Sequence, residues 1–202
     1  MHSALKYETL QLHRQLDSLP NLRILLQPAL SMAEYRRIMA AYAQVYSHVE
    51  QHLIQMEKTI TLDTLPGYTP RLPSLCDDLR SLAMPVDLQQ SEALMTSQLT
   101  QHQGIFHYIG LRYVLEGATQ GSKFIARRLE KNFPLLASKA FSFWNMQLEV
   151  SRQWPQFCEF INQPVKCRAC ERQMIQAAEN TFQIFIECFS FPGRQHEERL
   201  FW

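Results

Sequence analysis

The stretch Tyr113-Val-Leu-Glu-Gly-Ala-Thr-Gln-Gly-Ser122 places two glycines, Gly117 and Gly121, four residues apart in a segment with the periodicity of a long buried helix. Each glycine inside a helix costs about 1 kcal/mol relative to alanine. Gly110 lies on the same helical stripe, seven residues before Gly117. Such a stripe lets another group approach the backbone closely. A neighbouring helix and a planar ligand both fit this pattern, and spacing alone does not choose between them.

The wider composition excludes several classes of protein. The glycine segment carries Arg112, Glu116 and Lys123, so it lacks the roughly 18 apolar residues that a membrane-spanning helix needs. A formal charge of +1 gives no case for binding nucleic acid or a membrane surface. The N-terminus shows no secretory signal pattern, and an odd count of five cysteines agrees with reduced thiols. The expected compartment is therefore the cytoplasm.

Hydrophobic periodicity is helical almost throughout, and no stretch shows sustained strand alternation or a repeat. Ser31 and Glu34 form a capping-box pattern at the start of a helix predicted to reach Lys58. Further helical segments are predicted over 71–83, from Ser91 to about Asn132 with the glycines as bend points and an interruption at Pro134, over 141–160 around Pro155, and over 166–189. At 202 residues with 46% hydrophobic content, we expect one all-α helical bundle over residues 1–190 and a loose tail over 191–202.

The second informative segment is Ala4-Leu-Lys-Tyr-Glu-Thr-Leu-Gln-Leu-His-Arg-Gln-Leu16. As one helix, it places Lys6, Thr9 and His13 on a single stripe beside a row of leucines. Lys6 and His13 would lie roughly 10 Å apart along the axis. Such a histidine can offer a ring nitrogen to a metal while the lysine meets an acidic group of the same ligand. A partly buried histidine bonded to a backbone carbonyl explains the same pattern.

Together, the two segments resemble the haem oxygenase family. The pattern Ala-Leu-Lys-x-x-Thr-x-x-x-His, from Ala4 to His13, is similar to the family's proximal helix. Tyr-Val-Leu-Glu-Gly-x-x-x-Gly, from Tyr113 to Gly121, is similar to the distal helix of the bacterial branch associated with bacteriophytochromes. Further similarity runs through 42–50, 71–79 and 178–182, so the resemblance covers most of the chain.

The resemblance implies oxidative cleavage of haem, as both substrate and cofactor, to biliverdin, carbon monoxide and ferrous iron. An external donor such as a ferredoxin or a reductase would supply electrons, and a bacteriophytochrome would accept the biliverdin. The resemblance also assigns roles by position. His13 would bind the iron, with Lys6 at a haem propionate. Thr9, Arg112 and Tyr113 complete the implied haem-binding set, and the catalytic set is Gly117, Gly121, Thr119 and Ser122, the glycines admitting haem to the helix backbone and the hydroxyls ordering water.

This chain also departs from the family pattern. Ala118 stands where the best-known animal members carry an aspartate that orders water, and Glu179 and Gln183 stand on a late helix from which several members send basic residues to the propionates. A haem-binding or sensing protein of the same fold, without turnover, is therefore the alternative function. A third interpretation is a helical enzyme of the wider superfamily, such as a thiamin-related hydrolase or a di-iron oxygenase.

Several other side chains are alternative candidates for a metal site or a docking surface. His48 and His52 lie four residues apart at a spacing that can ligate a metal, and His102 and His107 precede the glycine segment. Cys167 and Cys170 form the one C-x-x-C pair, whereas a structural zinc site needs about four ligands. A basic cluster could dock an acidic electron donor, although a solvated helix face is the default interpretation; its members are Lys123, Arg127, Arg128 and Lys131.

Overall fold

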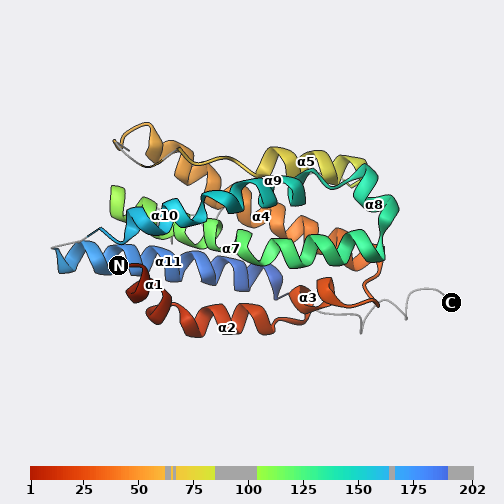
Figure 1. The fold of residues 1–202 in the computed structure, drawn as a ribbon, viewed down its shortest axis with the longest axis horizontal. Coiled ribbons are helices and arrows are strands. Elements are labelled where there is room, and N and C mark those ends of the chain that lie inside the picture. The colour runs from red at the N-terminus through yellow and green to blue at the C-terminus, as the bar shows by residue number, and fades with distance from the viewer. Residues whose placement is uncertain (62–64, 66, 85–103, 164–166, 191–202) are drawn as a thin grey trace.

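A computed structural model describes residues 1–61, 65, 67–84, 104–163 and 167–190, and all regular elements in these ranges are helical (Figure 1). The predicted all-α bundle is confirmed. The long helices are α4 (Met32–Glu57), α7 (Ile105–Asn132) and α11 (Arg168–Phe189). The shorter elements are α1 (His2–Glu8), α2 (Leu10–Ser18), α3 (Pro20–Arg23), the 3-10 turn η1 (Ile24–Leu26), α5 (Leu72–Ser81), α8 (Pro134–Lys139), α9 (Ser142–Val150), η2 (Ser151–Gln153) and α10 (Trp154–Ile161).

Several sequence predictions fall outside the described residues. The predicted start of the long helix at Ser91, the side chain of His102 and the tail over 191–202 all belong to this group. Within the described ranges, no helix combines the length and the apolarity that crossing a bilayer requires.

The capping box predicted at the start of α4 is confirmed. The Ser31 hydroxyl accepts a hydrogen bond from the amide of Glu34 at 3.2 Å, and the Glu34 carboxylate accepts one from the amide of Ser31 at 2.8 Å. The reciprocal bonds satisfy two amides that have no partner within the helix. From there α4 buries an aromatic core with α9 and α11, in which the Tyr42 ring lies 5.3 Å from Phe143 and 4.8 Å from Phe189, centroid to centroid.

The N-terminal segment predicted as one helix is interrupted, which corrects the expectation of a single straight stripe. α1 ends at Glu8 and α2 begins at Leu10. Between them, Thr9 is 2% exposed, and its hydroxyl donates to the carbonyl of Leu5 at 2.7 Å. A threonine hydroxyl bonded back to the preceding turn competes with the helical backbone and bends the chain. Lys6 and His13 therefore belong to different helices.

Two interpretations of the glycine stripe were open, a neighbouring helix and a planar ligand, and the surroundings of Gly110 decide between them at that position. A Cβ atom added there would lie 2.2 Å from the carbonyl oxygen of Met174 and 2.7 Å from the Cβ of Ala177, both on α11. Only a residue without a side chain lets α7 and α11 pack so closely. At this position the glycine serves helix-on-helix packing.

Candidate functional site

The remaining two stripe glycines lie on a looser part of α7. A Cβ on Gly117 would meet the indole ring of Trp154 at 3.6 Å, an ordinary contact, and a Cβ on Gly121 would meet nothing within 4 Å. One turn further on, Phe124 is 61% exposed although it is a large apolar residue. The stripe is therefore open at Gly121, in contrast to its closed part at Gly110.

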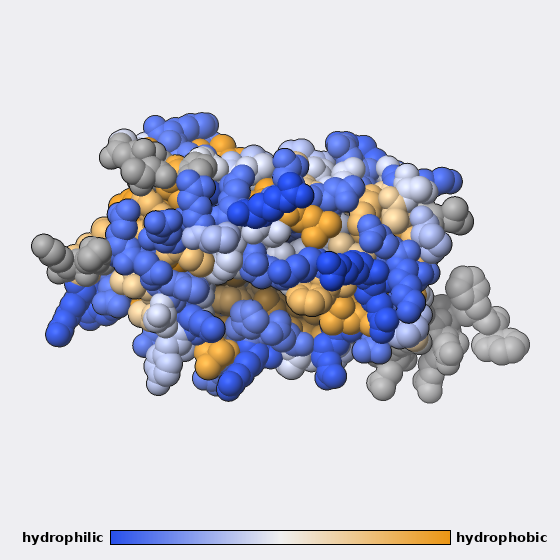
Figure 2. Space-filling model, viewed as in Figure 1, coloured by the Kyte–Doolittle hydropathy of each residue, from blue (hydrophilic) through white to orange (hydrophobic). Residues whose placement is uncertain are grey.

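A groove lies between α7 and α2 on one face of the molecule. α11 packs against both helices and lies between them, as Figure 1 shows. On the same face, Figure 2 shows hydrophobic residues in a recessed area between hydrophilic ones, over the region between α7 and α2. η1 adjoins the groove, because the Arg128 guanidinium on α7 donates to the carbonyl of Leu26 at 2.8 Å. At the α1 side, the His2 ring lies 5.7 Å from Trp154.

His13 lies on the α2 wall and is exposed. Its Nδ1 lies 2.9 Å from a carboxylate oxygen of Asp17, four residues later on the same helix, and the side chains are 59% and 66% exposed. The imidazole ring also lies 5.8 Å from the ring of Phe182 on α11. With Nδ1–H donated to Asp17, the lone pair of the neutral imidazole is on Nε2. This is the arrangement that histidine adopts when it binds a metal.

The other N-terminal candidates occupy different surroundings. Lys6 is exposed on α1, and Thr9 is buried at the bend between α1 and α2. Tyr113 on α7 reaches this bend: burial raises the pKa of its phenol, and a hydrogen bond with Thr9 partly offsets the rise. Thr9 and Tyr113 thus join the N-terminal segment, α1 and α2, to α7, whereas Lys6 is exposed to solvent.

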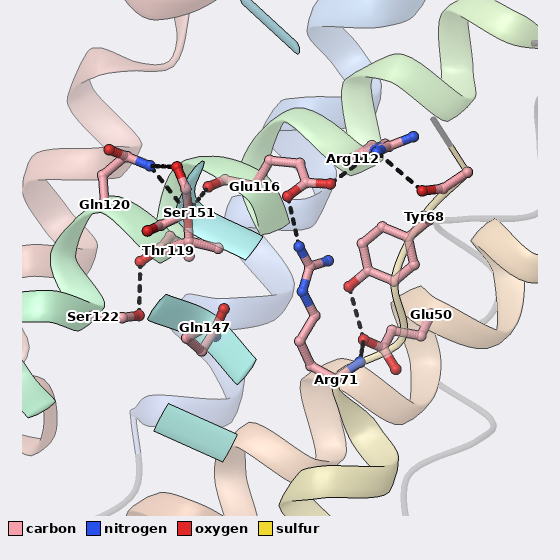
Figure 3. Close-up of polar contacts among 12 residues, drawn as sticks. Glu50, Tyr68, Arg71, Arg112, Glu116, Thr119, Gln120, Ser122, Gln147 and Ser151 are labelled. Carbon is pink, nitrogen blue, oxygen red and sulfur yellow. Dashed lines mark hydrogen bonds and ion pairs between the residues drawn. The ribbon is translucent and has the colours of Figure 1, made fainter. Parts of the chain in front are cut away.

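Arg112 lies in a buried ionic network rather than at the surface (Figure 3). Its Nε lies 2.9 Å from one carboxylate oxygen of Glu116, and Arg71 Nη2 lies 2.6 Å from the other. The three side chains are at most 2% exposed. A second carboxylate, Glu50, accepts from the Tyr68 hydroxyl at 2.7 Å. Burial raises the pKa of Glu50, and hydrogen bonds to its carboxylate partly offset that rise.

Thr119 and Ser122 are on the core side of α7. They are 0% and 3% exposed, and each hydroxyl donates to a carbonyl of the same helix: Thr119 to Glu116 at 2.6 Å and Ser122 to Ala118 at 3.2 Å. Figure 3 shows both residues with Gln120, whose amide donates to Thr119 and to the carbonyl of Ser151. Gly121, by contrast, is exposed.

The rival sites do not form a metal centre among the described residues, where no group of three or more histidine, cysteine or acidic side chains could hold an ion. His48 Nδ1 donates to the carbonyl of Gln44 at 2.7 Å, and the ring of His52 packs edge-on against that of His107. A cavity of about 450 Å³ lies beside His48, over α4 and the start of α5, away from the glycines; its lining is Ser47, His48, Glu50, Gln51, Ile54, Gln55, Pro70, Leu72 and Pro73.

Three residues of this region were missed from the sequence. Asp17 had a readable signal, because it follows His13 by four residues on a helix. Arg71 and Trp154 had none, because they reach α7 from segments that are distant in the chain. Their contacts depend on how the helices pack.

Comparison with known proteins agrees with this geometry. Residues 1–190 match the family model described as heme oxygenase. A heme oxygenase of Xanthomonas campestris is 30% identical over 159 residues, which cover 76% of this chain and 91% of that protein. The heme oxygenase structure from Leptospira interrogans matches with a TM-score of 0.74 at 16% identity, covering 93% of this chain and 97% of that one. The structure from Neisseria meningitidis matches with a TM-score of 0.69 at 20% identity, covering 95% and 92%. With an all-α fold, a groove between α2 and α7 and a family match along nearly its whole length, the chain belongs to the heme oxygenase family and is an enzyme that degrades haem.

Proposed function

We propose that this enzyme cleaves haem to biliverdin, carbon monoxide and ferrous iron, with electrons from an external donor such as a ferredoxin or a reductase. The observation that carries the proposal is the pairing of walls in the groove. One wall, α2, carries His13, whose Nδ1 is held by a carboxylate. The other wall, α7, carries Gly121, where an added Cβ would meet open space. We place haem between these two helices, with its iron toward His13.

His13 is the proposed iron ligand, through Nε2. Asp17 holds the Nδ1–H, which fixes the tautomer and makes Nε2 a stronger ligand. When bound, the haem iron supplies the site at which dioxygen is activated. Gly117 and Gly121 keep side chains out of the space above the ligand, and the exposed ring of Phe124 adds apolar surface.

The haem propionates need cationic partners, and Lys6 is the proposed one because it is exposed on α1, the helix that directly precedes α2. Arg112 is proposed to act indirectly, from the buried side of α7, because its guanidinium is bound to Glu116. Thr9 and Tyr113 are proposed to hold the proximal segment against α7. Thr119 and Ser122 are proposed to keep the helix carbonyls near Gly121 in place, which leaves the ordering of water to other groups.

Titration with hemin tests the ligand assignment. The purified apoprotein should bind one hemin per chain with a Soret band, and His13→Ala should weaken or shift that band because the proximal nitrogen is lost. His48→Ala is the matched control, since His48 lies beside the other cavity and its Nδ1 is bound to Gln44. A normal band in His13→Ala would reject His13 as the ligand.

A haem-binding or sensing protein without turnover is the second candidate, and Ala118 favours it because this position of the glycine segment has no carboxylate. Ascorbate or a ferredoxin reductase system should bleach the Soret band and give biliverdin absorbance if haem is cleaved. A stable reduced complex without any bilin would favour the second candidate.

Delivery of biliverdin to a bacteriophytochrome in the cytoplasm completes the proposed role.

A further inference from the structure

The glycine segment of α7 has few anchors outside its own helix. Thr119 and Ser122 bond to carbonyls of α7 itself, and Gly121 faces open space. Among the described residues, two hydrogen-bonded contacts reach residues 116–122 of this segment from other elements. Gln120 donates to the carbonyl of Ser151 at the long distance of 3.3 Å, and Arg71 binds Glu116, the residue just before Gly117, at 2.6 Å.

Arg71 is itself held firmly at its backbone. Its amide donates to Glu50 Oε1 at 2.6 Å, the amide of Leu72 donates to Oε2 at 3.0 Å, and the Tyr68 hydroxyl donates to Oε1. Glu50 lies in the interior of α4. The guanidinium then crosses to α7, and Figure 3 shows it pointing toward Glu116 with the Tyr68 ring beside it. Arg71 therefore links α4 rigidly to the start of the glycine segment.

The chemistry of this link is a poor device for stability alone. Arg71 is 0% exposed, and its Nε and Nη1 have no hydrogen-bond acceptor among the described residues. The guanidinium carbon lies instead 4.2 Å from the centroid of the Tyr68 ring. An unpaired buried donor is destabilising, and a buried ion pair often stabilises a fold no better than apolar residues of the same size. What the pair does provide is a fixed direction and distance between two elements.

We propose that Arg71 is a positioning residue: anchored to α4 through Glu50, it holds Glu116 and so sets the placement of Gly117–Gly121 above bound haem. This inference rests on the proposed function. Arg71 touches no substrate and acts through Glu116. Its effect falls on the geometry in which haem is cleaved rather than on whether haem binds.

Hydrogen exchange of the apoprotein tests the placement without haem. Arg71→Met removes the link but retains most of the side-chain length, and Glu116 keeps Arg112 as its partner, so that no buried charge is left alone. Amides of residues 117–122 should then exchange about tenfold faster or more, because the segment opens locally at lower cost. Arg80→Met is the matched control: it removes an exposed arginine of α5, the helix that directly follows Arg71, and should leave these amides unchanged.

The loaded enzyme gives a second readout. Arg71→Met should keep its hemin affinity but lose roughly 10- to 100-fold in kcat, since a misplacement of the order of 1 Å has effects of this size. The product should contain a changed mixture of bilin isomers, because the ring is cut at a different edge. Arg71→Lys, which keeps the charge, should restore the isomer pattern in part.

Three results would overturn the inference. The first is wild-type exchange at 117–122 in Arg71→Met, and the second is a lowered melting temperature with the wild-type isomer pattern and kcat. The third is unfolding of both Arg71→Met and the isosteric Glu116→Gln, which would make the link a requirement of the fold. Failure of the wild-type chain to bind hemin would reject the proposed function instead. The exchange experiment would still decide whether Arg71 holds residues 117–122 in place.

Discussion

His13 shows how much one neighbouring side chain can decide. An exposed histidine without a partner rotates freely and can carry its proton on either ring nitrogen, so neither nitrogen is held ready for a metal. The Asp17 carboxylate, 2.9 Å from Nδ1, removes the rotation and places the lone pair on Nε2. The spacing of four residues keeps the pair together as long as α2 stays helical.

Asp17→Asn should therefore weaken hemin binding by about 10- to 100-fold, the usual effect of removing the partner of a metal-bound histidine. Spectrophotometric titration measures the affinity. Asp77→Asn is the control, because Asp77 is equally exposed and pairs with an arginine three residues later. Equal affinities for the two variants would show that Asp17 does not orient the ligand.

The cysteines are expected to differ in reactivity because the hydrogen bonds and burial of their sulfur atoms differ. Cys167 caps α11, and its sulfur accepts a hydrogen bond from the amide of Cys170 at 3.3 Å. Hydrogen bonds from Cys170 lower the pKa of the Cys167 thiol, and the hydrogen bond with Cys167 raises that of Cys170. Burial raises the pKa of Cys188 to about 12.

Because the thiolate is the nucleophile, Cys167 should be alkylated by iodoacetamide at a lower pH than any other cysteine of the chain. Mass spectrometry of peptides after brief labelling between pH 6 and 9, roughly the range around a free thiol's pKa, measures the order. Labelling of Cys170 before Cys167 would reverse the assignment of donor and acceptor.

At the scale of the element, α7 uses its glycines in opposite ways. Gly110 meets the backbone of α11 and Gly121 meets open space, although both belong to one stripe. The free energy of unfolding should respond with opposite signs. Gly110→Ala should lower the stability of the apoprotein by about 1–3 kcal/mol through overpacking, whereas Gly121→Ala should raise it by up to about 1 kcal/mol through helix propensity. Thermal melts of the two variants measure this difference.

Gly121→Leu extends the same comparison to function. The side chain would enter the groove, so haem cleavage should be abolished while the far-UV circular dichroism of the apoprotein remains that of the wild type. Bilin formation under ascorbate is the measurement. Normal cleavage together with a clear fall in melting temperature would place Gly121 in the core and remove it from the site.

Local signals predicted the elements well. The capping box at Ser31, the short helix before Ala83 and the interruption at Pro134 could all be read from residues close together in the chain. The bend at Thr9 was missed because leucine periodicity continues through it, and only the burial of its hydroxyl against Leu5 reveals it. The link from Arg71 to Glu116 spans 45 residues, and no local pattern encodes such a contact.

For the whole molecule, charge is distributed unevenly around the groove. Lys123, Arg127 and Lys131 are exposed on α7 beside the ring of Phe124, although the chain as a whole carries a formal charge of only +1. An acidic electron donor would be steered to this surface, and the attraction would weaken above about 0.1 M salt.

Replacing these three residues by glutamate should therefore slow turnover driven by an acidic ferredoxin and leave turnover driven by ascorbate unchanged. Lys139→Glu on α8 provides the control, because this lysine is also exposed but lies in another helix. Initial rates of bilin formation at low and high salt give the comparison. Equal loss with both reductants would mean that the substitutions damage the site itself.

α2 presents one side to solvent. None of its residues is fully buried, and Leu12 and Leu16 are only partly covered. Haem, rather than another helix, would complete the packing at this edge of the molecule, so that ligand uptake would resemble the last step of folding. Calorimetry should then find a negative heat capacity change on hemin binding. Limited trypsin digestion should cut the apoprotein after Arg14 and spare the complex, since local opening would cost more once the ligand is seated.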